Sequence, residues 1–212
     1  MKINLHNFFK YYDDKNPKHL NAVKQLEKDI DKFASSLLDD SSNWVRLYRA
    51  NTEQKYYTLK VPFYPQTDNY RDPQRTCNSS ACAMCLEYFK PGTLKGVQGD
   101  NAYIQKVFAI GDTTDHNVQT RVLSGYGIDS KFSYDLSFSD LDSEIINKRP
   151  VVIGILHRGS LSNPVGGHMV VVIGKTSSGD YVCNDPYGSL NDNYTGPVIN
   201  GNNVVYKKSV LE

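Results

Sequence analysis

Apolar residues near the start of the chain recur at the spacing of an amphipathic helix. Between residues 17 and 38 they lie three or four positions apart, on one helical face: Leu20, Val23, Leu26, Ile30, Phe33 and Leu37. Pro17 suits the first turn of this helix, and the polar stretch 39–43 ends it. Residues 43–54 are a candidate second helix. Because so small a tract buries little core alone, we predict that residues 1–55 form an N-terminal helical extension of a larger domain.

From residue 56 onward the pattern changes to short periodic segments separated by turns. An extended segment at 56–64 is followed by four helical patterns, at 78–89, 101–111, 116–127 and 137–149. The last third has four strand patterns, at 150–157, 167–176, 180–186 and 202–210. The tight turn in "TSSGD" makes a hairpin of the middle two strands. Helices followed by a block of strands predict an α+β domain over residues 56–212.

Polar side chains suited to helix capping stand at two of the predicted helix starts. Asn78, Ser79 or Ser80 is expected to cap the helix at 78–89. Ser139 and Asp142 have the spacing of a capping box for the helix at 137–149.

The composition is that of a soluble globular protein. The 212 residues include 39% hydrophobic and 22% charged residues, with a formal net charge of +1. This charge does not indicate a nucleic-acid partner, and no apolar run is long enough for membrane insertion. The first 19 residues lack the pattern of a signal peptide, and four cysteines favour free thiols in a reducing compartment. We therefore expect a soluble, cytoplasmic protein.

Tyrosine is unusually frequent, with 15 residues. Its rigid ring and polar tip suit polar binding surfaces, but it also serves like phenylalanine at half-buried strand positions. Both explanations are open, and Tyr64, Tyr70 and Tyr187 are candidates to line a substrate cleft.

Three of the four cysteines lie in the stretch 75–89, where several functions are open to them. A zinc site would need a second closely spaced pair of ligands, and Cys183 stands alone in the rest of the chain. No metal or other cofactor is therefore expected. A redox pair would begin a helix, whereas Cys82 and Cys85 lie inside the predicted helix among apolar neighbours. We predict that these two are core thiols.

Cys77 is the candidate nucleophile, because it lies where a turn-rich loop meets the helix. There the free N–H groups and the helix dipole favour a thiolate. His168 follows two glycines at the start of an apolar strand, and Asp185 follows the other strand of the hairpin. Because the two positions are nearly symmetric about the turn, we expect a base oriented by a carboxylate at one end of the sheet. His157, at the end of a strand, is the rival base.

Gln66 is a candidate for stabilising a reaction intermediate, since it lies upstream of Cys77 in a turn. Its side-chain amide, together with the backbone N–H at the head of the helix, would form an oxyanion hole. The other histidines are weaker candidates, because His6 and His19 belong to the N-terminal tract and His116 lies in a polar segment.

These motifs, in this order, resemble those of the C39-like cysteine peptidases, a branch of the papain-like superfamily. The resembling stretches cover about residues 58–188 and are "VPFYPQTDN", "CNSSACAMCLEYF", "PVVIGI", "GGHMVVVIG" and "GDYVCNDPYG". The resemblance implies a papain-like α+β fold, in which a helix bearing the nucleophile packs on an antiparallel sheet. It also implies a cysteine peptidase in which Cys77 is the nucleophile, His168 the general base, Asp185 the orienting carboxylate and Gln66 the oxyanion donor.

The chain departs from the family pattern in two places. Asn78 and Ser79 stand where the family usually has glycine and proline after the cysteine. The loop between Gln66 and Cys77 is longer than usual, so that Gln74 competes for the oxyanion role.

The N-terminal tract is similar to the short helical leaders of some bacteriophage lysins. A lysin made in the host cytoplasm would act on the peptide part of peptidoglycan after release, which makes a peptide or peptidoglycan the expected partner. A cytosolic protease fits the same features. Two further alternatives are open: an acyl or transglutaminase-type transferase with the same triad, and a catalytically silent or virion-structural binding module.

Overall fold

The computed structural model describes two parts of the chain separately. It covers residues 57–156 and 166–211, with scattered residues between 16 and 29 and four positions between 159 and 164. Contacts between Cα atoms divide the chain into two compact units, Met1–Thr52 and Glu53–Glu212. The domain boundary expected at residue 55 remains a prediction.

In the first unit, the described residues from Pro17 to Asp29 are helical. This confirms the corresponding part of the predicted amphipathic helix. The rest of that helix and the candidate helix at 43–54 lie outside the described residues. Across the part of the chain that the structure describes, no helix combines the length and the apolar character needed to cross a membrane.

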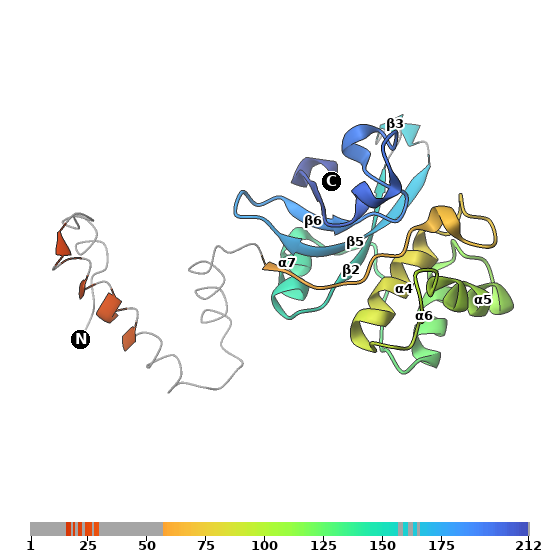
Figure 1. The fold of residues 1–212 in the computed structure, drawn as a ribbon, viewed down its shortest axis with the longest axis horizontal. Coiled ribbons are helices and arrows are strands. Elements are labelled where there is room, and N and C mark those ends of the chain that lie inside the picture. The colour runs from red at the N-terminus through yellow and green to blue at the C-terminus, as the bar shows by residue number, and fades with distance from the viewer. Residues whose placement is uncertain are drawn as a thin grey trace. The chain divides into compact units, whose positions relative to one another are not determined.

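The described part of the second unit contains four α-helices, which precede most of the sheet (Figure 1). They are α4 (Cys77–Phe89), α5 (Asp100–Ile110), α6 (His116–Gly125) and α7 (Phe138–Ile146). Each one overlaps a predicted helical segment, so all four predictions are confirmed. Short 3-10 turns lie before α4 at η1 (Gln66–Asp68) and in the C-terminal part of the chain at η2 (Leu190–Asp192), η3 (Val198–Gly201) and η4 (Lys208–Val210).

An antiparallel sheet is built around the long strand β5. Its strands are β1 (Tyr57–Thr58), β2 (Val151–Leu156), β5 (Gly167–Lys175), β6 (Tyr181–Asn184) and β7 (Val204–Tyr206). β5 pairs with β2 and β1 along one edge and with β6 along the other, and β6 pairs with β7. A separate ribbon joins β3 (Gly159–Ser160) to β4 (Asn163–Pro164). The predicted order, with helices before the strand block, is confirmed.

The hairpin between β5 and β6 sets the positions of two candidate site residues. Its turn is closed by the Thr176 N–H, which donates to the Asp180 carbonyl at 2.8 Å. Gly179 has a φ of 90°, a conformation that glycine adopts without strain. This confirms the turn predicted in "TSSGD". A bulge between Val172 and Gly174 then shifts the pairing by one residue, so that Val172 pairs with Cys183 and Val171 with Asn184.

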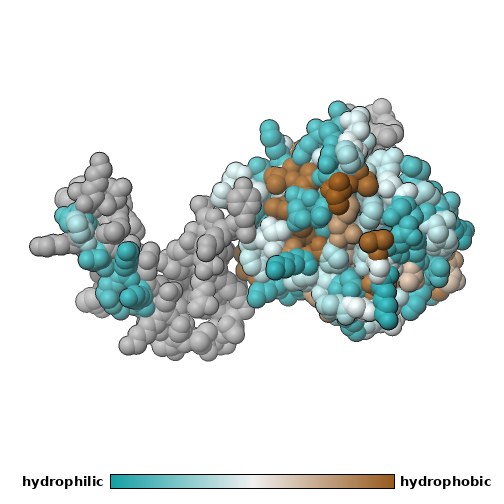
Figure 2. Space-filling model, in the orientation of Figure 1, coloured by the Kyte–Doolittle hydropathy of each residue, from teal (hydrophilic) through white to brown (hydrophobic). Residues whose placement is uncertain are grey.

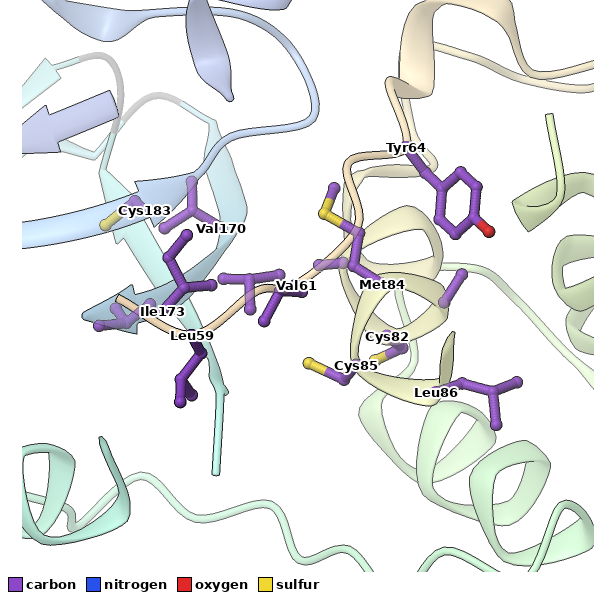
Figure 3. Close-up of a cluster of buried hydrophobic side chains, with 14 of the residues drawn as sticks. Leu59, Val61, Tyr64, Cys82, Met84, Cys85, Leu86, Val170, Ile173 and Cys183 are labelled. Carbon is purple, nitrogen blue, oxygen red and sulfur yellow. The ribbon is translucent and has the colours of Figure 1, made fainter. Parts of the chain in front are cut away.

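The core lies between α4 and the sheet (Figure 3). Every residue of α4 from Asn78 to Leu86 is buried. In Figure 3, Met84 and Cys85 of α4 point towards the sheet, whereas Leu86 points away from it. The residues opposite them are Val170 and Ile173 of β5 and Leu59 and Val61 of the segment after β1. On the visible face of the second unit, polar residues predominate, and apolar residues gather mainly over the sheet (Figure 2).

Cys82 and Cys85 are core thiols, as predicted. Both side chains are buried. Burial raises the pKa of Cys82 to about 12 and raises that of Cys85 well above its usual value. Two thiols that stay protonated at neutral pH are suited to packing rather than to redox chemistry.

The cap predicted for α4 is wrong. The helix begins at Cys77, and the N-cap residue is Thr76, whose side chain makes no capping hydrogen bond. Asn78, Ser79 and Ser80 lie inside the first turn, and Ser79 and Ser80 are completely buried. Because α4 is covered by its neighbours, polar side chains at these positions need partners from other helices rather than from their own backbone.

Those partners form a polar network beneath the start of α4. Ser80 Oγ donates to Asp100 Oδ2 at 2.7 Å. Ser79 Oγ lies 2.6 Å from Thr113 Oγ1 and accepts from Gln119 Nε2 at 2.9 Å. Ser80 therefore ties the first turn of α4 to α5, and Ser79 ties it to α6 and to the residues just before α6.

The capping box predicted for α7 is two residues out of register. The structure places it at Ser137 and Asp140, with both reciprocal hydrogen bonds present. The sequence repeats the Ser-x-x-Asp spacing, so that Ser139 and Asp142 were equally plausible. The earlier pair caps the helix, and Asp142 instead accepts a hydrogen bond from Tyr181 Oη at 2.8 Å.

Candidate active site

Cys77 occupies the first position of the buried helix α4. It is partly exposed, whereas the three other cysteines are buried. The loop before it turns sharply at Asp72, whose φ is 47°, and the Arg75 N–H closes that turn on the Asp72 carbonyl at 2.8 Å. The first residues of a helix have N–H groups without partners inside the helix, so the thiol lies beside donors suited to an anion.

His168 and Asp185 meet at the open end of the β5–β6 hairpin. Val171 pairs with Asn184, so that Asp185 follows directly beside Val170, two residues from His168 on the same sheet face. The Nε2 atom of His168 lies 2.6 Å from Oδ1 of Asp185, and both side chains are buried. The expectation that these residues lie together is confirmed as geometry.

The electrostatics of His168 favour the protonated ring. Burial alone would lower its pKa, but hydrogen bonds with Asp185 and Cys77, and the charges of both, raise it to about 9. The structure therefore brings Cys77, His168 and Asp185 together. Because Nε2 faces Asp185, the other ring nitrogen, Nδ1, is left for the thiol.

Gln66 lies close to the same loop. Its backbone N–H donates to the Pro186 carbonyl at 2.8 Å, next to Asp185 in sequence. Its side chain is buried, and Nε2 donates to the Pro73 carbonyl at 2.7 Å, which leaves its second N–H for another acceptor. Oε1 of this amide is buried without a hydrogen-bond partner.

Gln74, the competing amide, is in a different environment. Its side chain is exposed, and Oε1 accepts a hydrogen bond from Tyr187 Oη at 2.9 Å. The loop between Gln66 and Cys77, which is longer than the family pattern, is therefore involved with both candidate amides. Its Pro73 carbonyl accepts a hydrogen bond from Gln66, and its own residue Gln74 bonds to Tyr187.

His116, another histidine of the second unit, is not part of this constellation. His116 begins α6, lies 3.2 Å from Asn78 Nδ2 and stacks on Phe132 with ring centroids 3.8 Å apart. Burial lowers its pKa. The rival base, His157, lies outside the described residues, so its role remains a prediction.

The three tyrosines expected to line a cleft have different positions. Tyr64 is only 5% exposed and belongs to the hydrophobic core, so that expectation is wrong for this residue. Its hydroxyl donates to the Leu94 carbonyl at 3.3 Å. Tyr70 is 52% exposed, and the ring of Tyr187 lies edge-on to His168, with centroids 6.1 Å apart.

Two tyrosines at the site were missed by sequence analysis. Tyr206 Oη donates to Asp185 Oδ2 at 2.6 Å, and Tyr194 Oη reaches the same oxygen at 3.2 Å. The high tyrosine content was the signal, but nothing in the spacing of these residues indicated a shared carboxylate.

Comparison with known proteins agrees with this geometry. The model of the Peptidase_C39-like family matches residues 58–209, which contain Cys77, His168, Asp185 and Gln66. Searches of curated proteins and of solved structures found no match. The helix on the antiparallel sheet is the α+β, papain-like arrangement expected of this family. Because the match covers well over half of its length, the chain belongs to the Peptidase_C39-like family.

Proposed function

We propose that this protein is a cysteine peptidase in which Cys77 is the nucleophile, His168 the general acid and base, and Asp185 the orienting carboxylate. The observation that carries the proposal is the chain of contacts from Cys77 through His168 to Asp185. His168 is bonded to Asp185 at 2.6 Å, and contacts with both partners raise its pKa to about 9. Family membership supports cysteine peptidase activity in general.

The mechanism follows from the charge on His168. With a pKa of about 9, the ring is an imidazolium at neutral pH and favours a thiolate at Cys77. The thiolate attacks the carbonyl carbon of the scissile amide, and the imidazolium gives its Nδ1 proton to the leaving nitrogen. Neutral His168 then takes a proton from water, which attacks the thioester and releases the acid product. Asp185 keeps the ring oriented through Nε2 in both steps.

Gln66 is the preferred oxyanion donor of this mechanism. Its buried Nε2 is held by the Pro73 carbonyl with one N–H to spare, and the Cys77 backbone N–H is the natural second donor. Gln74 is exposed and its Oε1 is bonded to Tyr187, which makes it less suited to a fixed geometry. Loss of one such donor typically costs about 3 kcal/mol of transition-state stabilisation.

For the substrate, we propose the peptide part of peptidoglycan, cut by a phage-type endolysin. The support is the likeness of the N-terminal tract, residues 1–55, to the helical leaders of phage lysins. This part of the proposal is independent of the triad, and the two are tested separately.

Incubation with purified peptidoglycan and, in parallel, with an unfolded protein substrate tests both parts. Mass spectrometry should detect released peptidoglycan peptides with the natural chain and none with Cys77→Ala. His168→Ala should abolish release, whereas the matched variant His157→Ala should have a much smaller effect. Cleavage of the protein alone would remove the endolysin proposal and keep the peptidase. Hydrolysis by a clean Cys77→Ala preparation would refute the triad, and amine adducts in the products would indicate a transferase.

A further inference from the structure

The Asp185 carboxylate accepts several hydrogen bonds besides its contact with His168. It is completely buried. Oδ1 faces His168 Nε2 and accepts the backbone N–H of Tyr187 at 2.9 Å. Oδ2 accepts the hydroxyls of Tyr206 at 2.6 Å and Tyr194 at 3.2 Å. Both oxygens are thus used, and each has its own set of donors.

We propose that Tyr206 and Tyr194 are positioning residues, which clamp Oδ2 of Asp185 so that Oδ1 stays directed at His168. The proposal rests on the proposed function, since it concerns the same site. It adds two residues to the proposed site, and both tyrosines act only through the carboxylate.

Tyr206 has a hydroxyl whose orientation is fixed from both sides. It lies in β7, and its side chain is completely buried. Its oxygen accepts the Leu190 N–H at 2.9 Å, so that its own proton is directed to Asp185 Oδ2. Burial, followed by the negative charge of Asp185, raises the pKa of Tyr206, so its hydroxyl stays protonated at neutral pH.

Tyr194 is held at the carboxylate by an unusual backbone. Asn193 and Tyr194 have φ values of 55° and 59°, a left-handed conformation that residues other than glycine rarely adopt. Such conformations persist where the surrounding structure over-determines them, and they cluster at functional sites. Here the strained turn directs the Tyr194 hydroxyl to Asp185.

The rings of this loop also enclose His168. Tyr187 and Tyr194 lie edge-on to the imidazole, with centroids 6.1 Å and 5.9 Å from it, and 5.1 Å from each other. Two thiols also belong to these surroundings: Cys77 raises the pKa of His168, and the charge of Asp185 helps to raise the pKa of Cys183. Packing around the ring thus restricts its rotation, while the two hydroxyls restrict the carboxylate.

Removing the hydroxyls of Tyr206 and Tyr194 could change the pKa of His168 in either direction. The direction shows whether the hydroxyls orient the Asp185 carboxylate or only reduce its negative charge. A carboxylate with fewer donors but unchanged orientation attracts the imidazolium more strongly, and the pKa of His168 would rise. A carboxylate that is no longer held turns away from the ring, and the pKa of His168 would fall towards its ordinary value of 6.5. Positioning predicts the second outcome.

The experiment is an NMR titration of His168 in the full chain. The signal is assigned by its absence in His168→Gln among the five histidines. The variants are Tyr206→Phe, Tyr194→Phe and the double variant. We expect the pKa of His168 to fall by about one pH unit or more in the double variant, with smaller falls in the single ones. The far-downfield Nε2 proton should broaden or vanish with it.

Tyr181→Phe is the matched control. Tyr181 is also completely buried, pairs with Tyr206 across the sheet, and donates its hydroxyl to a different carboxylate, that of Asp142, at 2.8 Å. It should leave the titration of His168 unchanged. A pKa of His168 that rises or stays constant in the Tyr206 and Tyr194 variants would overturn the proposal. Should the double variant fail to fold, the single variants decide by the same criterion.

This titration does not depend on any peptidase activity. A falling pKa of His168 in a chain that hydrolyses nothing would support the clamp and count against the proposed function. An unchanged pKa in an active enzyme would do the reverse.

Discussion

The raised pKa of His168 predicts how the free energy of unfolding changes with pH, and Asp185→Asn tests this prediction. The folded protein binds the His168 proton more tightly than the unfolded chain, because Asp185 and Cys77 hold the imidazolium. Protonation therefore stabilises the fold, and this contribution is fully present below the unfolded pKa of 6.5. It is lost as the pH rises through the folded value of about 9.

The magnitude follows from the two pKa values. Raising the pKa from 6.5 to about 9 corresponds to about 3 kcal/mol of stabilisation at acidic pH. Of this, about 2 kcal/mol is lost between pH 6.5 and pH 8.5. In Asp185→Asn the carboxylate charge is gone and burial lowers the His168 pKa, so this loss should disappear from the same pH range.

Urea unfolding followed by circular dichroism at pH 6.5, 7.5 and 8.5 measures the effect. The comparison is the change in unfolding free energy with pH in the natural chain minus the change in Asp185→Asn. Groups away from the site titrate alike in both proteins, so the difference isolates Asp185 and the groups that it contacts, His168 first among them. Equal pH dependence in the two proteins would show that His168 and Asp185 do not form the buried ion pair described here.

Three further substitutions test the surroundings of the site by the same unfolding measurement. Burial raises the pKa of Asp100 from 3.8 to about 6, so the free energy of unfolding falls as the pH rises through this range. Asp100→Asn should therefore be more stable than the natural chain above pH 6, by up to about 3 kcal/mol. This gain should vanish below pH 4, where the carboxyl is protonated in both the folded and the unfolded chain. Ser79→Ala leaves buried donors and acceptors without a partner and should cost about 1–3 kcal/mol, while the exposed Ser124→Ala should be nearly neutral. Gly201→Ala would drive a Cβ into the Asp185 carbonyl, so it should destabilise the fold by about 1–3 kcal/mol and displace the Asp185 loop; no loss would show that this loop adapts freely.

Periodicity and turn chemistry were sufficient to predict most of the fold and the central pair of the site. The apolar spacing predicted each of the four helices, because each buries one or more faces against the sheet or its neighbours. The proximity of His168 and Asp185 was predictable for a different reason: a short turn brings two strands side by side. That the two side chains share one face also depends on a bulge between Val172 and Gly174, which the sequence analysis did not predict. Cys77 was identified because the start of a helix has a recognisable chemistry of its own.

Side chains whose partners come from distant segments could not be assigned in this way. Ser80 was expected to cap its own helix, but it donates to Asp100, and only the packing of α5 against α4 makes that carboxylate available. Tyr206 and Tyr194 reach Asp185 from β7 and from a strained loop, and no periodic pattern encodes that convergence. Tyr64 and Tyr187 were both expected to line the cleft because tyrosine is frequent in this chain, yet Tyr64 lies in the core.

The most direct test of the central claim is selective alkylation of the four thiols. The full chain is treated with limiting iodoacetamide at pH 6.5, and the label is located by peptide mass mapping. We expect Cys77 to react first, because it is partly exposed beside a protonated His168, while the three buried thiols react slowly. His168→Ala should slow the labelling of Cys77 while the three buried thiols stay slow. Preferential labelling of Cys82, Cys85 or Cys183, or a Cys77 rate unaffected by His168→Ala, would contradict a thiolate–imidazolium pair at this site.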